Sequence, residues 1–468
     1  MPYPYALSLK KNIQIEKDNG DLLLIGVDSA LRFKNPSPGI HAGIISLANK
    51  VLTEEDLSHV ITERDGSIDW GKFYFYITNI EEKRFFRKTV QVGNYSLATL
   101  EPISSSFTFI EHDISAETEY QLSRFAYSHV EDGKMILESP LGHARVILED
   151  WRASAIIGML AVPCSLNGIN DNFRDFGLEN IRAFLQLLLN TNAISEPNEE
   201  PDKPLTQWDF HDLLFHSRSR MGRYDKPFGG TFRFLEKIDP LPAVKPPMSD
   251  QIMELSKPDL EKLKNEDIPF TKVIETRRSI REYSKKPISV KELGEFLFRA
   301  ARVIKVMPAM PEVGAYYESS LRPYPGGGAV YEHELYLMIN NCDGLNQGLF
   351  HYNPKDHVLE KLSDMNDDIE KLLLDAKRSA AMDKNDPQVL ITLAARFQRF
   401  SWKYQSMAYS AILKNVGVLY HQMYLIATAM GLAPCGIGGG NSDLFAKAAN
   451  LNFYEETSVG EFLLARPK

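Results

Sequence analysis

The N-terminal 200 residues contain the same order of polar turn, apolar strand and apolar helix twice. The turns around Gly20 and Gly133 lie 113 residues apart, and each precedes a short apolar run that predicts a hairpin strand. Apolar helical stretches follow at 39–51 and 151–160. Two copies of one hairpin-and-helix unit predict two small tandem domains, and chance similarity over so few residues is the alternative.

The first copy has the pattern of a winged-helix unit. Thr53 is predicted to cap a helix, with Asp56 at the capping-box position. Alternating residues on both sides of Gly93-Asn94 predict a two-stranded hairpin. The helical stretch 39–51 carries one lysine in thirteen residues, so it lacks a basic surface for reading nucleic acid. We therefore expect a protein or peptide ligand.

Two proline-rich stretches, 195–205 and 239–248, cannot continue a helix or a central strand and are predicted to be connectors. Between them a helical pattern starts near Trp208. It is followed by four basic residues, which are Arg218, Arg220, Arg223 and Lys226. This cluster is either a contact for an anion or cofactor or a solvated basic turn, and the pattern does not separate the two.

Helical and strand patterns alternate from Lys257 onward, which favours an α/β or α+β catalytic body. The predicted helices span 259–270 and 289–304, and the predicted strands span 333–340 and 388–397.

The stretch 415–433 has no formal charge and is just long enough to span a bilayer. It contains four polar residues, which are Asn415, His421, Gln422 and Thr428. We therefore predict a helix that is buried within the protein rather than a membrane span.

The length of 468 residues suits two to four domains. With 53 basic and 62 acidic residues the net charge is −9, so the chain lacks the basic field of a protein that binds nucleic acid by charge. The three cysteines are far apart and without CxxC spacing, which excludes a disulfide framework or a cysteine-based zinc site. The start lacks the apolar core of a secretory signal. We expect a cytoplasmic protein without a metal site.

Three guanidinium groups and a hydroxyl lie within five positions, at Arg277, Arg278, Ser279 and Arg281. Arginine offers fork-shaped, permanently charged donors that suit a phosphate monoester. On composition alone, a charged run is more often a solvated face.

Glycine-rich runs at 325–328 and 436–440 allow the backbone to approach a flat ligand closely and to present amide donors. The first run precedes the predicted strand 333–340, and the second follows the long apolar stretch. Neither run has the GxGxxG of a dinucleotide site or the GK[ST] of a P-loop. A Rossmann site and an NTPase are therefore unsupported.

In this order, the arginine-serine cluster, the proline-glycine turn before a strand and the apolar helix ending in a glycine run resemble the FMN-dependent nitroreductase-like fold. This resemblance covers roughly the last 200 residues. Trp402-Lys403-Tyr404 resembles the azoline oxidases of thiazole- and oxazole-forming peptide pathways, in which a Lys-Tyr pair sits at the active site. The tandem N-terminal units and the segment 215–223 look most like cyanobactin-type thiazoline oxidases.

The resemblance implies an α+β protein in which a C-terminal nitroreductase-like FMN domain follows two N-terminal winged-helix-like peptide-clamp domains. We expect the clamp units at 1–105 and 106–195, a proline-rich linker with a connecting helix at 196–250, and the FMN oxidase domain at 251–468.

By position, the resemblance implies that Arg277, Arg278 and Ser279 hold the FMN phosphate, with Arg466 as an addition. Arg281 is expected near the pyrimidine edge of the flavin, where positive charge stabilises the reduced ring. The residues expected to line the isoalloxazine ring are Pro325, Gly326, Gly327, Gly328, Gly436, Ile437, Gly438 and Gly439. Gly326 stands where serine is common in the family, so this position offers no side-chain hydroxyl.

Lys403 and Tyr404 are the predicted catalytic residues. Converting a thiazoline to a thiazole removes a proton from one ring carbon and a hydride from its neighbour, and a positioned base must take the proton. The base is either a lysine whose pKa is lowered by burial and nearby arginines, or a tyrosine made acidic by the lysine. Without the resemblance, the ordinary interpretation of the pair is an exposed lysine over a packed ring.

The resemblance implies oxidation of thiazoline or oxazoline rings in a heterocyclised precursor peptide with a leader segment, with oxygen reoxidising the flavin. An NAD(P)H-dependent nitro or quinone reductase and a flavin-free peptide-binding scaffold are the alternatives. The reductase is disfavoured because small diffusible substrates need no clamp. We also expect a homodimer, as in the resembled fold, and a leader bound by strand addition to a hairpin edge, with no nucleic acid or membrane partner.

Overall fold

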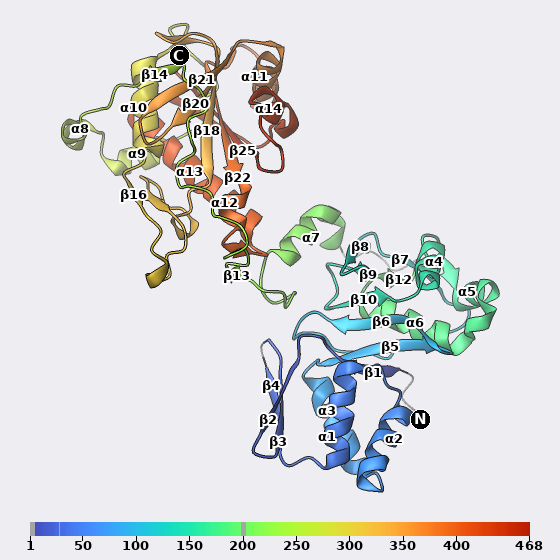
Figure 1. The fold of residues 1–468 in the computed structure, drawn as a ribbon. Coiled ribbons are helices and arrows are strands. Elements are labelled where there is room, and N and C mark those ends of the chain that lie inside the picture. The colour runs from blue at the N-terminus through green and yellow to red at the C-terminus, as the bar shows by residue number, and fades with distance from the viewer. Residues whose placement is uncertain (1–4, 28, 198–202) are drawn as a thin grey trace. The chain divides into compact units, whose positions relative to one another are not determined.

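The computed structural model describes residues 5–27, 29–197 and 203–468. It separates into two compact units, Met1–Lys226 and Pro227–Lys468 (Figure 1), and each is described by itself. Pro201, one of the predicted connector prolines, and the first four residues lie outside the described ranges.

The first part of the N-terminal unit packs three helices against strands. Its elements are β1 (Ala6–Leu9), β2 (Gln14–Asp18), β3 (Asp21–Ile25), β4 (Ala30–Phe33), α1 (Pro38–Asn49), α2 (Glu54–Asp65), α3 (Trp70–Glu82), β5 (Phe86–Val92) and β6 (Tyr95–Pro102). The predicted capping box is confirmed, because the Thr53 hydroxyl accepts from the Asp56 amide and the Asp56 carboxylate accepts from the Thr53 amide. The hairpin at Gly93-Asn94 is also confirmed, as the turn between β5 and β6.

The second part of this unit repeats the hairpin and the helix. Its elements are β7 (Glu119–Leu122), β8 (Tyr127–Glu131), β9 (Lys134–Glu138), β10 (Ala144–Leu148), α4 (Trp151–Met159), β11 (Cys164–Ser165), α5 (Leu166–Asn172), α6 (Leu178–Asn190), β12 (Ile194–Ser195) and α7 (Phe210–Arg218). Gly20 and Gly133 both occupy hairpin turns, at φ of +92° and +73°. A residue with a side chain would be strained at these φ values. The backbone conformation of the turn therefore explains why both copies have glycine at this position.

One sheet connects the two regions that were predicted as separate clamp units. Its order is β1-β5-β6-β10-β9-β8, and β6 pairs with β10 so that Leu100 lies opposite Val146. The predicted boundary at residue 105 therefore falls between strands that are hydrogen-bonded neighbours. In the first copy, by contrast, the β2-β3 hairpin belongs to a separate three-stranded sheet with β4.

Three residues of the basic cluster at the end of α7, namely Arg218, Arg223 and Lys226, bind groups of their own unit. Arg218 donates to the buried Glu138 carboxylate at 2.9 Å, and Lys226 pairs with Glu131 at 2.6 Å. Arg223 donates to the carbonyl oxygens at positions 140 and 141. Burial opposes ionisation of Glu138, but hydrogen bonds from Tyr127 and Arg218 outweigh it and lower the pKa of Glu138. Arg218 is therefore neither a free anion contact nor part of a solvated turn.

The C-terminal unit is built on one seven-stranded sheet of order β14-β21-β20-β18-β22-β25-β24. Its elements are β13 (Gly229–Gly230), β14 (Ile252–Glu254), α8 (Leu260–Glu266), α9 (Phe270–Thr276), β15 (Ile288–Ser289), α10 (Val290–Ala301), β16 (Lys305–Met307), β17 (Ser319–Leu321), β18 (His333–Ile339), β19 (Cys342–Asp343), β20 (Gly348–Asn353), β21 (Val358–Asp364), α11 (Asp367–Ser379), β22 (Val389–Arg396), α12 (Phe397–Ser401), β23 (Tyr404–Gln405), α13 (Ala408–Ala429), β24 (Ala433–Ile437), α14 (Ser442–Ala448) and β25 (Glu456–Ala465).

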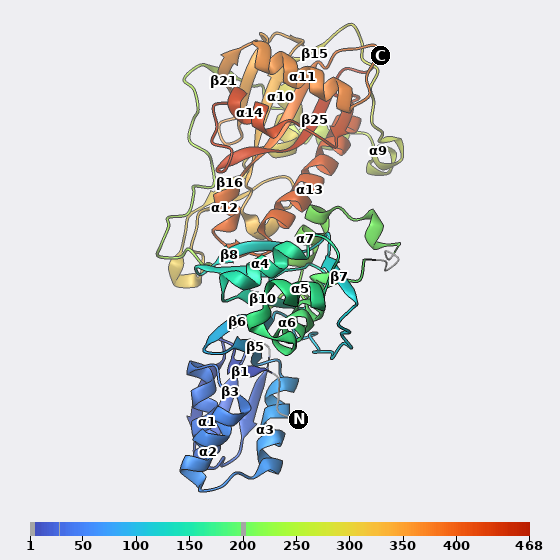
Figure 2. The same cartoon turned by 90° about the vertical axis from the view of Figure 1, so that its right-hand side faces the viewer.

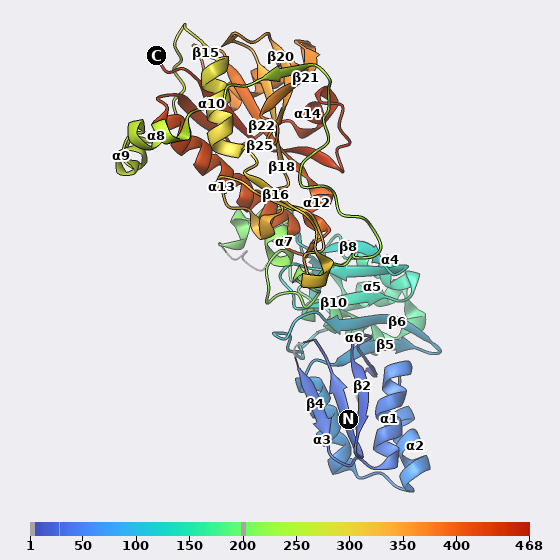
Figure 3. The same cartoon turned by 60° about the vertical axis from the view of Figure 1, so that its left-hand side comes forward.

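Helices cover both faces of this sheet (Figures 2 and 3). Apolar residues of α10 and α13 pack on one face, and those of α11 and α14 pack on the other. The strand predicted at 388–397 is the fully buried β22, between β18 and β25. The helix predicted at 259–270 ends at Glu266 as α8, because Pro269 disfavours a helical conformation at the residue before it.

The apolar stretch 415–433 forms most of α13, which begins at Ala408. Residues such as Leu419 and Met423 join the core between α10 and the sheet. The prediction of a helix buried on all sides is wrong in part, because Leu413, Gly417 and His421 are exposed. Among the described helices, none has the length and apolar composition that a membrane span requires. This helix positions two polar residues, Asn415 and Tyr424, that contact the predicted site.

Candidate active site

The predicted catalytic pair lies directly against the first glycine run. Gly328 has φ of +61°, and a Cβ at this position would lie 2.8 Å from Lys403 Nζ and even closer to the Tyr404 hydroxyl. Only glycine fits here. The turn and the pair are 75 residues apart in sequence, and β23, which contains Tyr404, pairs with β13 across Gly230.

Lys403 is half-buried and held by aromatic side chains. Its Nζ donates to the Tyr317 hydroxyl at 2.8 Å and lies 5.1 Å from the centroid of the Tyr404 ring. Burial lowers the pKa of Lys403, but the hydrogen bonds and charge interactions with Tyr317 and Tyr404 together outweigh it, so the pKa is raised above the ordinary lysine value. The prediction of a lowered pKa is therefore wrong, as is the alternative of an exposed lysine.

Two residues that the sequence analysis did not assign to the site fix the glycine turn. Tyr317 donates to the Gly328 carbonyl oxygen at 2.7 Å, and the Gly327 amide donates to Asn415 Oδ1 at 3.3 Å. Asn415 in turn donates to Glu332 at 2.9 Å. A polar residue within an apolar helix is the signal that could have identified Asn415, whereas no motif surrounds Tyr317.

The arginine cluster forms an open pocket of about 460 Å³. Its lining residues are Arg278, Ser279, Ile280, Arg281, Glu282, Pro467 and Lys468. The backbone is fixed there because the Ile280 amide donates to the Pro434 carbonyl at 2.9 Å. Arg277 lies beside this pocket, with its guanidinium 5.2 Å from the Tyr424 ring centroid. Two of the four predicted phosphate residues, Arg278 and Ser279, therefore line this cavity, together with Arg281, which was predicted at the pyrimidine edge of the flavin.

Tyr424 connects the arginine cluster to the second glycine run. Its hydroxyl lies 2.7 Å from Ser279 Oγ and accepts from the Gly436 amide at 2.7 Å. Gly436 belongs to β24, and no atom lies within 4 Å of a Cβ built on Gly438 or Gly439. The backbone of the second glycine run therefore borders open space without side chains in between. A planar ring could approach the backbone closely at this place.

Arg466, like Arg277, does not line this pocket. Its guanidinium donates to both carboxylate oxygens of Glu292, at 2.5 and 2.6 Å. Glu292 is also the capping-box residue of α10. Arg466 therefore holds the start of α10 and does not contribute to the lining of the arginine pocket.

These groups fit a phosphorylated, planar cofactor. From Asn415 to Tyr424, α13 advances about 13.5 Å, so it connects the glycine turn at one end with the arginine pocket at the other. The pocket end offers guanidinium and hydroxyl donors suited to a phosphate. The other end offers glycine backbone, aromatic rings and one lysine, which suit a redox-active ring.

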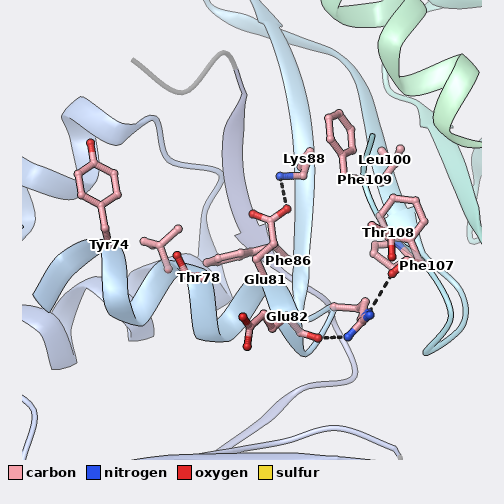
Figure 4. A pocket seen from close by; sticks show the side chains of 13 residues that line it. Tyr74, Thr78, Glu81, Glu82, Phe86, Lys88, Leu100, Phe107, Thr108 and Phe109 are labelled. Carbon is pink, nitrogen blue, oxygen red and sulfur yellow. Dashed lines mark hydrogen bonds and ion pairs between the residues drawn. The ribbon is translucent and has the colours of Figure 1, made fainter. Parts of the chain in front are cut away.

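A separate groove lies in the N-terminal unit, between α3 and the sheet (Figure 4). The cavity has a volume of about 390 Å³ and is lined by α3, β5, β6 and residues 107–109. Lys88 pairs with Glu81 at 2.6 Å across it. A second, smaller hollow shares Tyr74 and Ile77 and continues toward β1 and the start of α2. The two hollows form one groove along α3, called the α3 groove below.

Two curated proteins are similar to the C-terminal part of the chain. The nitroreductase-named protein MJ1384 of Methanocaldococcus jannaschii is 29% identical over 186 residues, covering 40% of this chain and 84% of that protein. The microcin B17-processing protein McbC of Escherichia coli is 28% identical over 135 residues, covering 28% of this chain and 49% of McbC. A solved nitroreductase structure from Ralstonia eutropha shares 18% identity, covers 52% of this chain and 99% of its own, and has a TM-score of 0.36.

Three family models match consecutive parts of the chain. The ThcOx helix-turn-helix domain matches residues 1–110, which confirms the winged-helix-like prediction for the first unit. The cyanobactin oxidase ThcOx matches residues 120–225, and the nitroreductase family matches residues 274–462. In this order, the matches show that the chain combines regions similar to the helix-turn-helix and oxidase parts of the cyanobactin oxidase ThcOx with a nitroreductase-like domain.

Proposed function

We propose that this protein is an FMN-dependent azoline oxidase. It dehydrogenates thiazoline or oxazoline rings in a ribosomally made precursor peptide to thiazoles or oxazoles, and oxygen reoxidises the flavin. The observation that carries the proposal is the contact of Lys403 and Tyr404 with Gly328, because it brings a proton-transfer pair to the glycine run of the nitroreductase-family domain. The match to the cyanobactin oxidase family supports the same reaction.

In this proposal, one group of site residues binds the cofactor and another group transfers the proton. When bound, the flavin supplies a hydride acceptor for one ring carbon of the azoline. Arg278 and Ser279 would hold its phosphate, with Arg277 beside them. Arg281 would lie near the pyrimidine edge, and the glycine runs would line the ring system. The Lys403-Tyr404 pair accepts the proton that leaves the neighbouring ring carbon. The aromatic rings of Phe232 and Tyr317 lie around the Lys403 ammonium group.

The reaction is tested by incubating the purified protein with a heterocyclised precursor peptide in air and without NAD(P)H. We expect each azoline ring to lose two hydrogens, which mass spectrometry resolves. Turnover that required NAD(P)H and a nitroaromatic would favour the reductase instead. A protein that bound no flavin would favour the scaffold.

We further propose that the α3 groove binds the leader segment of the peptide. On the outer edge of β1, Leu7 already exchanges both backbone hydrogen bonds with Leu52, so strand addition at Leu7 would have to displace them. The groove instead offers an apolar lining, and Tyr74 stands beside it with 47% of its surface exposed. Exposed aromatic groups beside a groove are typical of peptide-binding surfaces.

Replacing Tyr74 by alanine is expected to raise the KM for a leader-containing azoline peptide about tenfold, because an aromatic anchor of the groove is lost. The kcat and the KM for a leaderless azoline peptide should not change. Phe75→Ala is the matched control, since Phe75 neighbours Tyr74 on α3 but does not line the groove. Equal KM values for wild type and Tyr74→Ala would argue against leader binding there.

A homodimer in the cytoplasm is part of the proposal. The pocket of Arg278 and Arg281 is open on its outer side, which would allow a second subunit to complete it. Light scattering of the purified protein tests the oligomeric state. We propose no nucleic-acid or membrane partner.

A further inference from the structure

Three separate segments of the C-terminal unit surround the ammonium group of Lys403. Lys403 Nζ lies 5.1 Å from the ring centroids of Tyr317 and Tyr404 and 5.6 Å from that of Phe232. Phe232 follows β13, and Tyr317 lies in the connection between β16 and β17. The faces of aromatic rings attract a cation, so this cage favours the charged form of the lysine over the neutral amine.

The Tyr317 hydroxyl has fixed hydrogen-bonding roles. It donates its single proton to the Gly328 carbonyl oxygen at 2.7 Å. Its oxygen can therefore only accept from Lys403, at 2.8 Å. The lysine is held as a donor by an oxygen that is itself fixed to the glycine turn. Tyr317 thus sets where the positive charge stands relative to Gly328.

Tyr404 completes the arrangement. Its ring stacks on Phe400 at a centroid distance of 4.7 Å, and its hydroxyl reaches the same face of Gly328 as Lys403 Nζ. A caged ammonium has no lone pair to receive a proton, whereas a tyrosinate oxygen does.

We propose that Tyr317 is a positioning residue that holds Lys403 as an ammonium beside Tyr404, so that Tyr404 and not Lys403 accepts the ring proton. This inference rests on the proposed azoline oxidation. In the step, the C–H bond of one ring carbon breaks and its proton forms the O–H bond of Tyr404. The electron pair left behind forms the new ring double bond as the neighbouring carbon loses its hydride to the flavin. The tyrosinate is regenerated when Tyr404 returns the proton to solvent.

The first test measures Lys403 itself in the flavin-loaded protein, without turnover. The rate of acetylation of Lys403 by acetic anhydride is followed by mass spectrometry across a range of pH. Only the neutral amine reacts, so we expect Tyr317→Phe to be acetylated at Lys403 about tenfold faster than wild type at the same pH, since one hydrogen bond to the ammonium is lost. Tyr316→Phe is the matched control. It removes the hydroxyl of the neighbouring tyrosine and keeps the ring of that residue, which packs on Phe232.

The second test compares azoline oxidation as a function of pH. Tyr317→Phe should keep its flavin, lose about tenfold in kcat and show a shifted pH profile, whereas Tyr316→Phe should match wild type. Tyr404→Phe should retain less than a tenth of the activity. An unchanged acetylation rate and pH profile in Tyr317→Phe, or more than a tenth of the activity in Tyr404→Phe, would overturn the inference. Wild-type protein that fails to oxidise azolines would instead contradict the proposed function, and the acetylation result would still report the state of Lys403.

Discussion

Replacing Lys403 by alanine is expected to leave the flavin bound and to lower azoline oxidation about 10³-fold, within the range that positioned proton-transfer groups contribute. Lys403 contacts Tyr317, Tyr404 and the glycine turn, so its removal takes a positive charge from the place where a proton leaves the substrate. The arginine pocket lies at the other end of α13 and should be unaffected. Flavin absorbance and the rate of hydrogen loss from the peptide, measured on the same sample, separate the two effects.

The control for this variant is Lys305→Ala, because Lys305 is an exposed lysine on β16. It should behave as wild type in both measurements. Full oxidase activity in Lys403→Ala would remove Lys403 from the reaction. Loss of the flavin together with the activity would show that Lys403 holds the cofactor rather than assisting proton transfer.

Replacing Arg278 by alanine is expected to weaken flavin binding by one to two orders of magnitude. Arg278 lines the open pocket with Ser279 and Arg281, and a charge-assisted hydrogen bond to a phosphate contributes about 1.5–3 kcal/mol. The protein should therefore purify with little flavin, and activity should return when excess FMN is added. Dialysis against buffer without flavin, followed by an absorbance spectrum, measures the loss.

Riboflavin serves as a second ligand that sharpens this experiment. It lacks the phosphate, so Arg278→Ala should affect FMN binding strongly and riboflavin binding little. Lys285→Ala is the charge control, since Lys285 is an exposed cation shortly after the cluster. Wild-type flavin occupancy in Arg278→Ala would contradict the assignment of the pocket to the phosphate.

Local features of the sequence were sufficient to predict local structure. The capping box at Thr53 and the hairpin turns at Gly20, Gly93 and Gly133 involve residues close in sequence, and their backbone requirements are specific. The glycine at position 328 was predicted to approach a ligand, and the structure shows that a side chain there would meet Tyr404. These features could be predicted because the residues that form each of them lie within one short segment of the sequence.

Contacts between distant residues could not be predicted in the same way. The partner of Arg218 is Glu138, 80 residues earlier, so the basic cluster could not be distinguished from a solvated turn. The partner of Lys403 is Tyr317, 86 residues earlier, and this hydrogen bond contributes to a raised lysine pKa, opposite to the expected direction. Arg466 was assigned to the phosphate by position, while the structure pairs it with Glu292, 174 residues away.

The order of the strands in the N-terminal sheets could not be predicted from the sequence either. The hairpins of the two N-terminal copies have the same local pattern, but only the second one joins the sheet of β5 and β6. Which strand pairs with which depends on packing across the whole unit, and alternating residues do not encode it.

The most direct test of the central claim is an anaerobic mixing experiment with the flavin-loaded protein and an azoline-containing precursor peptide, in the absence of NAD(P)H. The account predicts that the visible absorbance of the flavin bleaches as the peptide loses two hydrogens for each flavin reduced, and that admitting oxygen restores the colour. Flavin that stays oxidised in the presence of the peptide but bleaches on addition of NAD(P)H would contradict it.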